Sequence, residues 1–208
     1  MSAFSYCKEL KVVELPDTVR VIDGYAFIDC VSLKTVNLNN SIITINGNAF
    51  SGCKALELTS LPSNLITLGQ GAFMNCGSGL QLTSIPAGIE TLESWTFSNC
   101  PNVKISIFGS NNGENRLKNI GNNCFYNAGN GTSGPGVVDI VFNSSVDKIG
   151  VQAFAGYATN TLQSVYFAKD FLTNPVIYGY PLDNKDPNGQ CVGFDFDKLD
   201  EGRLEVNV

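Results

Sequence analysis

Apolar and polar residues recur along this chain with a period of about 23 residues, which is typical of a repeat protein. The clearest marker is a phenylalanine that is found seven times, at steps of 23, 23, 23, 24, 28 and 29 residues: Phe4, Phe27, Phe50, Phe73, Phe97, Phe125 and Phe154. A small residue precedes each phenylalanine, and a cysteine follows three residues later in the first five copies. This spacing predicts seven stacked coils over residues 1–167.

Each copy continues with a short run in which apolar and polar residues alternate. The first copy reads L-x-x-V-x-L-P, with Leu10, Val13, Leu15 and Pro16. Alternation with a period of two predicts a β-strand with one inward side, and the proline ends it because proline cannot donate to the ladder. A second apolar pair, such as Val19 and Ile22, precedes the next phenylalanine turn. We therefore expect a β-rich, right-handed solenoid with one short strand per coil, a parallel concave sheet and little α-helix.

The phenylalanines and cysteines are predicted to form two buried columns. One large ring per coil at the same place should stack with an offset on the ring of the next coil. Cysteines at one equivalent position point the same way in every coil, so they are expected to be buried thiols rather than disulfides. Cys124 and Cys191 lie outside this column.

Two polar, turn-rich insertions and a tail interrupt the repeat. Residues 110–116 and 129–136 are expected to be exposed loops, and residues 168–208 are expected to form a C-terminal cap. Within the tail, oxygen-bearing residues have the spacing of a calcium loop. The candidate calcium ligands are Asn184, Asp186, Asn188 and Asp195. No other metal or cofactor is expected. An ordinary turn is the alternative interpretation of the same residues.

The outward side of the predicted concave sheet is the candidate partner-binding surface. It is expected to present Thr35, Asn37, Leu58, Ser60, Leu82, Ser84, Ile105, Ile107, Asp139, Val141 and Tyr166. Its middle is apolar, and exposed apolar patches mark contact sites. In the alternative interpretations, the insertions or the tail fold over this face, or the strand register slips by one residue and the apolar members belong to the core.

Composition excludes several function classes. The formal charge is −6 and lysine plus arginine total 13 without a cluster, so neither nucleic acid nor an anionic membrane surface is an expected partner. Histidine is absent, which removes the commonest general base and zinc ligand. The outward acids Glu14 and Asp139 lie several coils apart, so no catalytic carboxylate pair is expected and the chain is predicted not to be an enzyme. No signal peptide is visible at the first residues, and no apolar run is long enough for membrane insertion.

The unit A-F-x-x-C-x-x-L-x-x-V-x-L-P over residues 3–167 resembles the BspA-type leucine-rich repeat, a 23-residue variant found in surface proteins of host-associated bacteria and some protists. The resemblance implies a leucine-rich-repeat solenoid, no catalytic residues, a cell-surface or secreted location, and adhesion through the concave face. The expected partner is a protein or a glycan, and self-association stays open. The alternatives are a structural spacer within a longer surface protein and a glycan-binding module.

Overall fold

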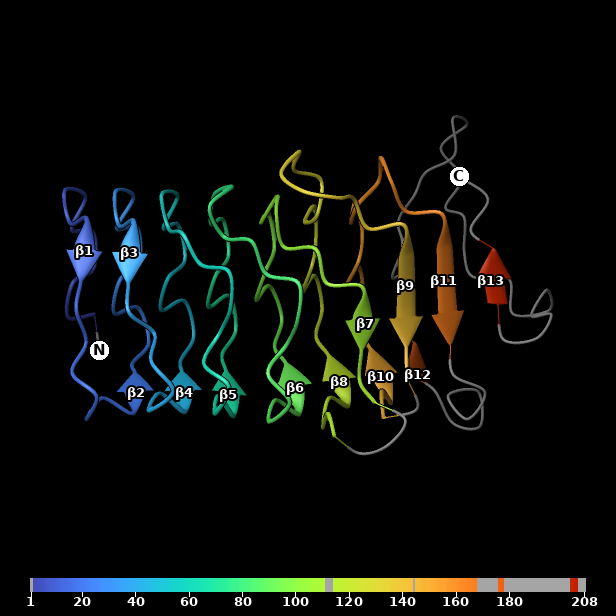
Figure 1. The fold of residues 1–208 in the computed structure, drawn as a ribbon, viewed down its shortest axis with the longest axis horizontal. Coiled ribbons are helices and arrows are strands. Elements are labelled where there is room, and N and C mark those ends of the chain that lie inside the picture. The colour runs from blue at the N-terminus through green and yellow to red at the C-terminus, as the bar shows by residue number, and fades with distance from the viewer. Residues whose placement is uncertain (1, 111–113, 144, 168–175, 178–202, 206–208) are drawn as a thin grey trace.

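The computed structural model describes residues 2–110, 114–143 and 145–167, together with two further strands, β12 (Val176–Ile177) and β13 (Arg203–Glu205). The coils lie side by side in one row, with the N-terminus at one end and β11 near the other (Figure 1). The described segments contain no helix, and hence no helix that could cross a membrane. The predicted parallel β-solenoid is confirmed.

In each coil, the turn around the repeated phenylalanine (the phenylalanine turn) is followed by the short run of alternating apolar and polar residues. We call this run the first-strand segment of the coil. Five of these segments contain strands: β1 (Val12–Val13), β3 (Thr35–Val36), β7 (Ile107–Phe108), β9 (Asp139–Phe142) and β11 (Ser164–Phe167). They form two parallel groups, β1–β3 and β7–β9–β11, and β13 pairs with β11 in the antiparallel sense. Coils three and four contribute a single bridge, Leu58 to Leu80. The first-strand sheet is therefore broken in the middle of the solenoid.

A second short strand precedes the phenylalanine turn of the next coil, which the sequence prediction of one strand per coil did not include. These strands are β2 (Val21–Ile22), β4 (Thr44–Ile45), β5 (Thr67–Leu68), β6 (Thr91–Leu92), β8 (Asn119–Ile120) and β10 (Lys148–Ile149). They pair in parallel as β2–β4–β5 and β6–β8–β10–β12. The last residue of each of these six strands, an isoleucine or leucine, is buried. The second residue of the apolar pair seen in the sequence, such as Ile22, therefore belongs to a strand and to the core.

The phenylalanine turn has the same backbone shape in every coil. The residues two before and two after each phenylalanine all have positive φ, from Ser2 and Tyr6 around Phe4 to Gln152 and Gly156 around Phe154. This left-handed region favours glycine, asparagine and aspartate, which explains why these residue types recur there. Trp95 has a φ of 64°, which is unusual for a bulky side chain.

The predicted phenylalanine column is confirmed. Successive rings from Phe4 to Phe154 have centroids 5.1–6.0 Å apart and interplanar angles of 4–22°. These distances at near-parallel orientation correspond to offset stacking. The interior rings are buried, whereas Phe4 at the end of the row is 48% exposed. Between the two ends of the column, each coil therefore places a phenylalanine ring against both neighbouring coils.

The cysteine column is also confirmed, and the structure shows how the thiols are satisfied. The Sγ–H of Cys30, Cys53, Cys76 and Cys100 donates to the carbonyl of the phenylalanine in the coil before, at 2.9–3.2 Å. All four are buried free thiols, and so is Cys124, which replaces the small residue before Phe125. Burial raises the pKa of the Cys53 thiol to about 12 and raises that of Cys76 as well. Cys7, in coil one, is exposed.

Thiol labelling tests this column. In a Cys191→Ser variant at pH 8, we expect Cys7 to react with a thiol reagent at once, because reaction requires an accessible thiolate. The buried cysteines should react only when the chain unfolds, since burial both blocks access and disfavours the thiolate. Mass spectrometry of the labelled peptides gives the result. Rapid labelling of Cys53 or Cys76 in the folded protein would contradict the buried column.

The C-terminal predictions fall largely outside the described residues. The solenoid is described up to Phe167 in β11. Of the predicted cap at residues 168–208, only β12 and β13 are described, and they extend the two sheets at this end. The candidate calcium ligands Asn184, Asp186, Asn188 and Asp195 lie outside the described residues.

Candidate binding surface

The outward side chains of the first-strand segments form what we call the first-strand face, which corresponds to the predicted binding surface. Among the residues predicted there, Thr35, Ser60, Ser84, Ile107 and Asp139 are exposed, and Asn37, Leu58, Val141 and Tyr166 are half-buried. Ile107 is 60% exposed and is the most exposed apolar residue of the predicted set. All nine side chains have some exposed surface, although Leu58 also packs against the core.

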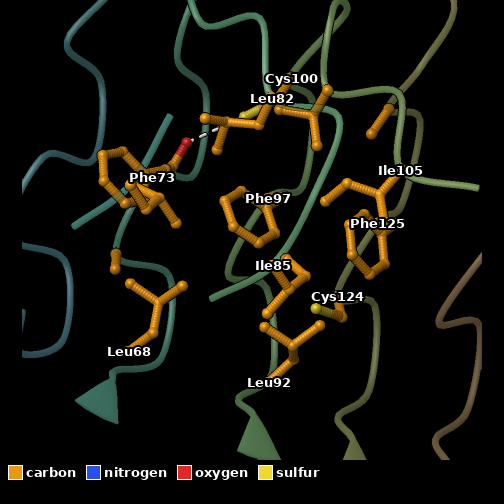
Figure 2. Close-up of a cluster of buried hydrophobic side chains, with 14 of the residues drawn as sticks. Leu68, Phe73, Leu82, Ile85, Leu92, Phe97, Cys100, Ile105, Cys124 and Phe125 are labelled. Carbon is orange, nitrogen blue, oxygen red and sulfur yellow. Dashed lines mark hydrogen bonds between the residues drawn. The ribbon is translucent and has the colours of Figure 1, made fainter. Parts of the chain in front are cut away.

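The prediction that Leu82 and Ile105 point outward is wrong. Both side chains are 0% exposed. They lie in the apolar cluster with Phe97 and Phe125 (Figure 2). The continuous apolar patch expected in the middle of this face therefore does not exist, because Leu82 and Ile105 belong to the core.

The reason is that the coils use two different apolar spacings in the first-strand segment. Coils one, two, six and seven share the apolar spacing of L-x-x-V-x-L, with other apolar residues at some positions, so the third position after the first apolar residue is inward, as at Val36. Coils three to five instead share the spacing of L-x-L-x-x-L, as at Leu80, Leu82 and Ile85, and all three of these residues are buried. In these coils the second position is inward and the third is polar. A single register applied to all seven coils places Leu82 and Ile105 on the wrong side.

The surface residues that the single register misses are mostly small and hydroxylated. In coil three Thr59 and Ser60 are both exposed, and in coil four Thr83 and Ser84 are both exposed. Two consecutive outward residues break the alternation that a strand requires, and coils three and four have only a bridge, whereas coil five forms β7 at the last two residues of its segment. Reading each coil's apolar spacing separately would have identified the missed threonines.

A polar hollow lies beside this break, between coils four to six and the insertion at residues 129–136. Its volume is about 550 Å³. Polar side chains line it together with the apolar Pro135, Val137 and Val138, and the polar ones include Gln81, Thr83, Lys104, Ser106, Ser133 and Asp139. Among the described lining residues, Lys104 and Asp139 are the charged ones, and they have opposite sign. The hollow therefore offers both donors and acceptors with little net charge.

The insertion is held firmly against coil five. The backbone N–H groups of Gly129 and Gly131 donate to the carbonyls of Cys100 and Pro101, at 3.2 and 2.6 Å. The Lys104 Nζ donates to the carbonyl of Ser133 at 2.7 Å. Three hydrogen bonds therefore tie the first five residues of the insertion to coil five, which reduces the ordering cost of binding a partner there.

Asn102 lies at the base of this wall. It is 3% exposed, and its Nδ2 donates to the carbonyl of Ser78 at 2.7 Å. Its Oδ1 is buried and has no hydrogen-bond partner among the described residues. A Cβ at Gly131 would lie 1.9 Å from that oxygen, so only glycine lets the insertion approach the coil this closely.

The chemistry of this surface suits binding by hydrogen bonds. Among the described residues no group of three or more histidine, cysteine, aspartate or glutamate side chains could hold a metal ion. Glu14 and Asp139 belong to coils one and six, as the sequence predicts, and Asp139 lines the hollow without a second carboxylate. The hollow thus contains hydroxyls, amides and one pair of opposite charges.

Comparison with known proteins gives a family match and two similar solved structures. The family described as "BspA type Leucine rich repeat region (6 copies)" matches residues 1–104 and 57–174. A leucine-rich repeat protein from Bacteroides ovatus is 24% identical, with a TM-score of 0.47, over 88% of this chain and 55% of that one. A leucine rich cell surface protein from Faecalibacterium prausnitzii is 21% identical, with a TM-score of 0.42, over 80% of this chain and 62% of that one. The chain thus spans less than two thirds of either protein. No curated protein matches the sequence.

Proposed function

The chain belongs to the BspA-type leucine-rich repeat family, and from this premise we propose that it is a non-catalytic binding module whose partner contacts the first-strand face at the polar hollow. The observation that carries the proposal is the insertion at residues 129–136, which borders the hollow on this face and is hydrogen-bonded to coil five. Solenoids offer extended binding surfaces, and per-repeat insertions border the binding face.

The partner that we propose is a protein, and the proposed setting is adhesion at the cell surface or after secretion. The resemblance to surface proteins supports this setting. The exposed Ile107 lies in coil five beside the half-buried Lys104 and Ser106 of the hollow. An apolar side chain next to hydroxyls and a charged pair fits the mixture of apolar centre and polar rim found at protein interfaces.

A matched pair of substitutions tests the proposal. Thr83 lines the hollow, and Thr67 in β5 is an exposed threonine of the second-strand sheet. Binding is first screened on arrays of extracellular-matrix proteins and glycans. Thr83→Arg should then weaken any interaction found by at least about tenfold, because the long side chain fills the hollow.

Thr67→Arg adds the same side chain elsewhere and should leave binding unchanged. Both variants should keep the wild-type melting temperature, since both positions are exposed. If the two variants bind equally well, or if the wild-type protein binds nothing on either array, the proposed site is wrong. The second result would favour the structural spacer.

The lining of the hollow favours a glycan as the second candidate partner. Gln81, Thr83, Ser106 and Ser133 provide hydroxyl and amide groups without a dominant charge, and such groups match sugar hydroxyls because each can donate or accept. Binding confined to the glycan array, and lost in Thr83→Arg, would select this candidate over the protein partner.

A further inference from the structure

An aromatic pair lies at the surface of two adjacent phenylalanine turns. Trp95, the single tryptophan of the chain, comes two residues before Phe97 in coil five, and Tyr126 directly follows Phe125 in coil six. The rings of Trp95 and Tyr126 are tilted by 58°, with their centroids 6.3 Å apart. Trp95 is 38% exposed and Tyr126 is half-buried. These two coils therefore present aromatic rings to solvent outside the buried phenylalanine column.

The backbone at Trp95 indicates that the indole adds little to the stability of the turn. Its φ of 64° lies in the left-handed region, which is costly for a bulky side chain. The equivalent residues in coils three, four and six are Asn48, Gly71 and Asn123, and these residue types suit that region. An asparagine at position 95 would therefore relieve strain, while the indole is only partly buried in return. A tryptophan at this position favours contact with another molecule.

Side-chain amides lie next to the aromatic pair. The backbone N–H of Trp95 donates to the carbonyl of the exposed Asn122 at 3.0 Å, and that of Asn99 donates to the carbonyl of Tyr126 at 2.7 Å. The Nδ2 of Asn99 donates to the Oδ1 of Asn75 at 2.9 Å, and both asparagines are exposed. Each amide has two donor hydrogens and an oxygen with two lone pairs. The bond between Asn75 and Asn99 therefore leaves donors and acceptors for a ligand.

Rings and amides without charge fit a neutral sugar. The phenylalanine turns of coils four to six, at residues 70–76, 94–100 and 122–128, contain no charged residue. Nucleic-acid bases also stack on aromatic rings, but their backbone requires cationic side chains nearby. A protein interface covers about 800 Å² on each partner, whereas an aromatic side chain buries about 150–250 Å². A pyranose ring is small enough to pack its C–H groups on one indole, and its hydroxyls donate and accept as the amides do.

We propose that Trp95 and Tyr126 form a binding site for a neutral carbohydrate, in which a pyranose ring stacks on the indole and its hydroxyls bond to the amides of Asn75 and Asn99. Among the described residues that line the hollow, none belongs to this site. The carbohydrate site therefore does not rest on the proposed function, and a substitution in the hollow should leave it unchanged.

Coil two contains a matched control position. Tyr25 has the place of Trp95 in its own turn, with a φ of 59° and a side chain that is 46% exposed. The residue that corresponds to Tyr126 is Ser51, which is not aromatic. Asp29 brings a negative charge into this turn. We therefore expect no sugar binding at Tyr25, although its backbone and exposure resemble those of Trp95.

Fluorescence tests the proposal in the unmodified chain, because all indole emission comes from Trp95. The probes are the neutral oligosaccharides cellohexaose, xylohexaose, mannohexaose and chitohexaose. At saturation, at least one of them should shift the emission and lower the acrylamide quenching constant by about twofold or more, because a stacked sugar covers the indole. The proposal is overturned if none of these sugars changes the emission or the quenching.

Calorimetric titration of variants with the same sugar locates the site. Trp95→Asn should weaken binding by at least about tenfold and should not lower the thermal midpoint, because asparagine suits the left-handed backbone. Trp95→Gly replaces it if that variant does not fold. Tyr25→Asn should bind the sugar as tightly as the wild type does.

The comparison with the hollow separates this site from the proposed function. Thr83→Arg should leave the sugar affinity and the quenching of Trp95 unchanged. Loss of sugar binding in Thr83→Arg would place the sugar in the hollow and overturn the proposal. Equal affinities of the Trp95→Asn and Tyr25→Asn variants would also overturn it, because the aromatic pair would then make no specific contribution.

Discussion

Replacing Phe73 with alanine should lower the free energy of unfolding by about 3–5 kcal/mol. The ring is 0% exposed and stacks on Phe50 at 5.3 Å and on Phe97 at 6.0 Å. Its removal leaves a cavity that opens two coil interfaces at once, and in a solenoid each interface supports its neighbours. Urea unfolding followed by circular dichroism gives the magnitude.

Phe4→Ala provides the internal control for this prediction. The same side chain is removed from the same column, but Phe4 is 48% exposed and stacks on one ring only. We expect its loss to cost much less than that of Phe73, because less apolar area is removed from the core. A cost below about 1 kcal/mol for Phe73→Ala would mean that the column does not hold the coils together.

Leu82→Glu should have an effect at least as large, about 4 kcal/mol or more, because it places a carboxylate where a leucine is 0% exposed. The neighbouring variant Thr83→Glu adds the same group at an exposed position and should change stability by no more than about 0.5 kcal/mol. Thermal and urea unfolding of the two variants compare adjacent positions in one chain. A stable, folded Leu82→Glu protein would restore the outward register that the structure rejects.

The contrast between Leu82 and Thr83 shows that some features of the fold can be predicted from the sequence and others cannot. The phenylalanine and cysteine columns follow directly from the 23-residue spacing, because equivalent positions in stacked coils must lie in a line. Burial of Phe50 and Cys53 needs no knowledge beyond that period. The coil stack, the parallel strands and the lack of disulfides in the cysteine column could therefore be predicted from residue positions alone.

The candidate surface was harder to predict because it depends on a shift of one residue within each coil. Leu58, Leu82 and Ile105 follow the first apolar residue by two positions, whereas Val13 and Val36 follow it by three. A slip of one residue moves a strand's side chains to the opposite face. The sequence contains this difference, but the shared repeat conceals it when all the coils are placed in one register.

The hollow could not be predicted from the repeat at all. It forms where an insertion in coil six folds back on coil five, and its wall is fixed by contacts such as Lys104 to Ser133. These contacts join residues of two coils through a loop that has no counterpart in the other coils. Polar composition indicates that such a loop is exposed, but not which part of the solenoid it covers.

Lysine footprinting on a complex with a partner identified by the arrays tests the central claim most directly. Lys104 lines the hollow, whereas Lys118 is an exposed lysine that immediately precedes β8 in the second-strand sheet. Our account predicts that partner binding slows acetylation of Lys104 and leaves that of Lys118 unchanged. Protection of Lys118 with Lys104 still reactive would place the binding surface on the second-strand sheet and contradict the account.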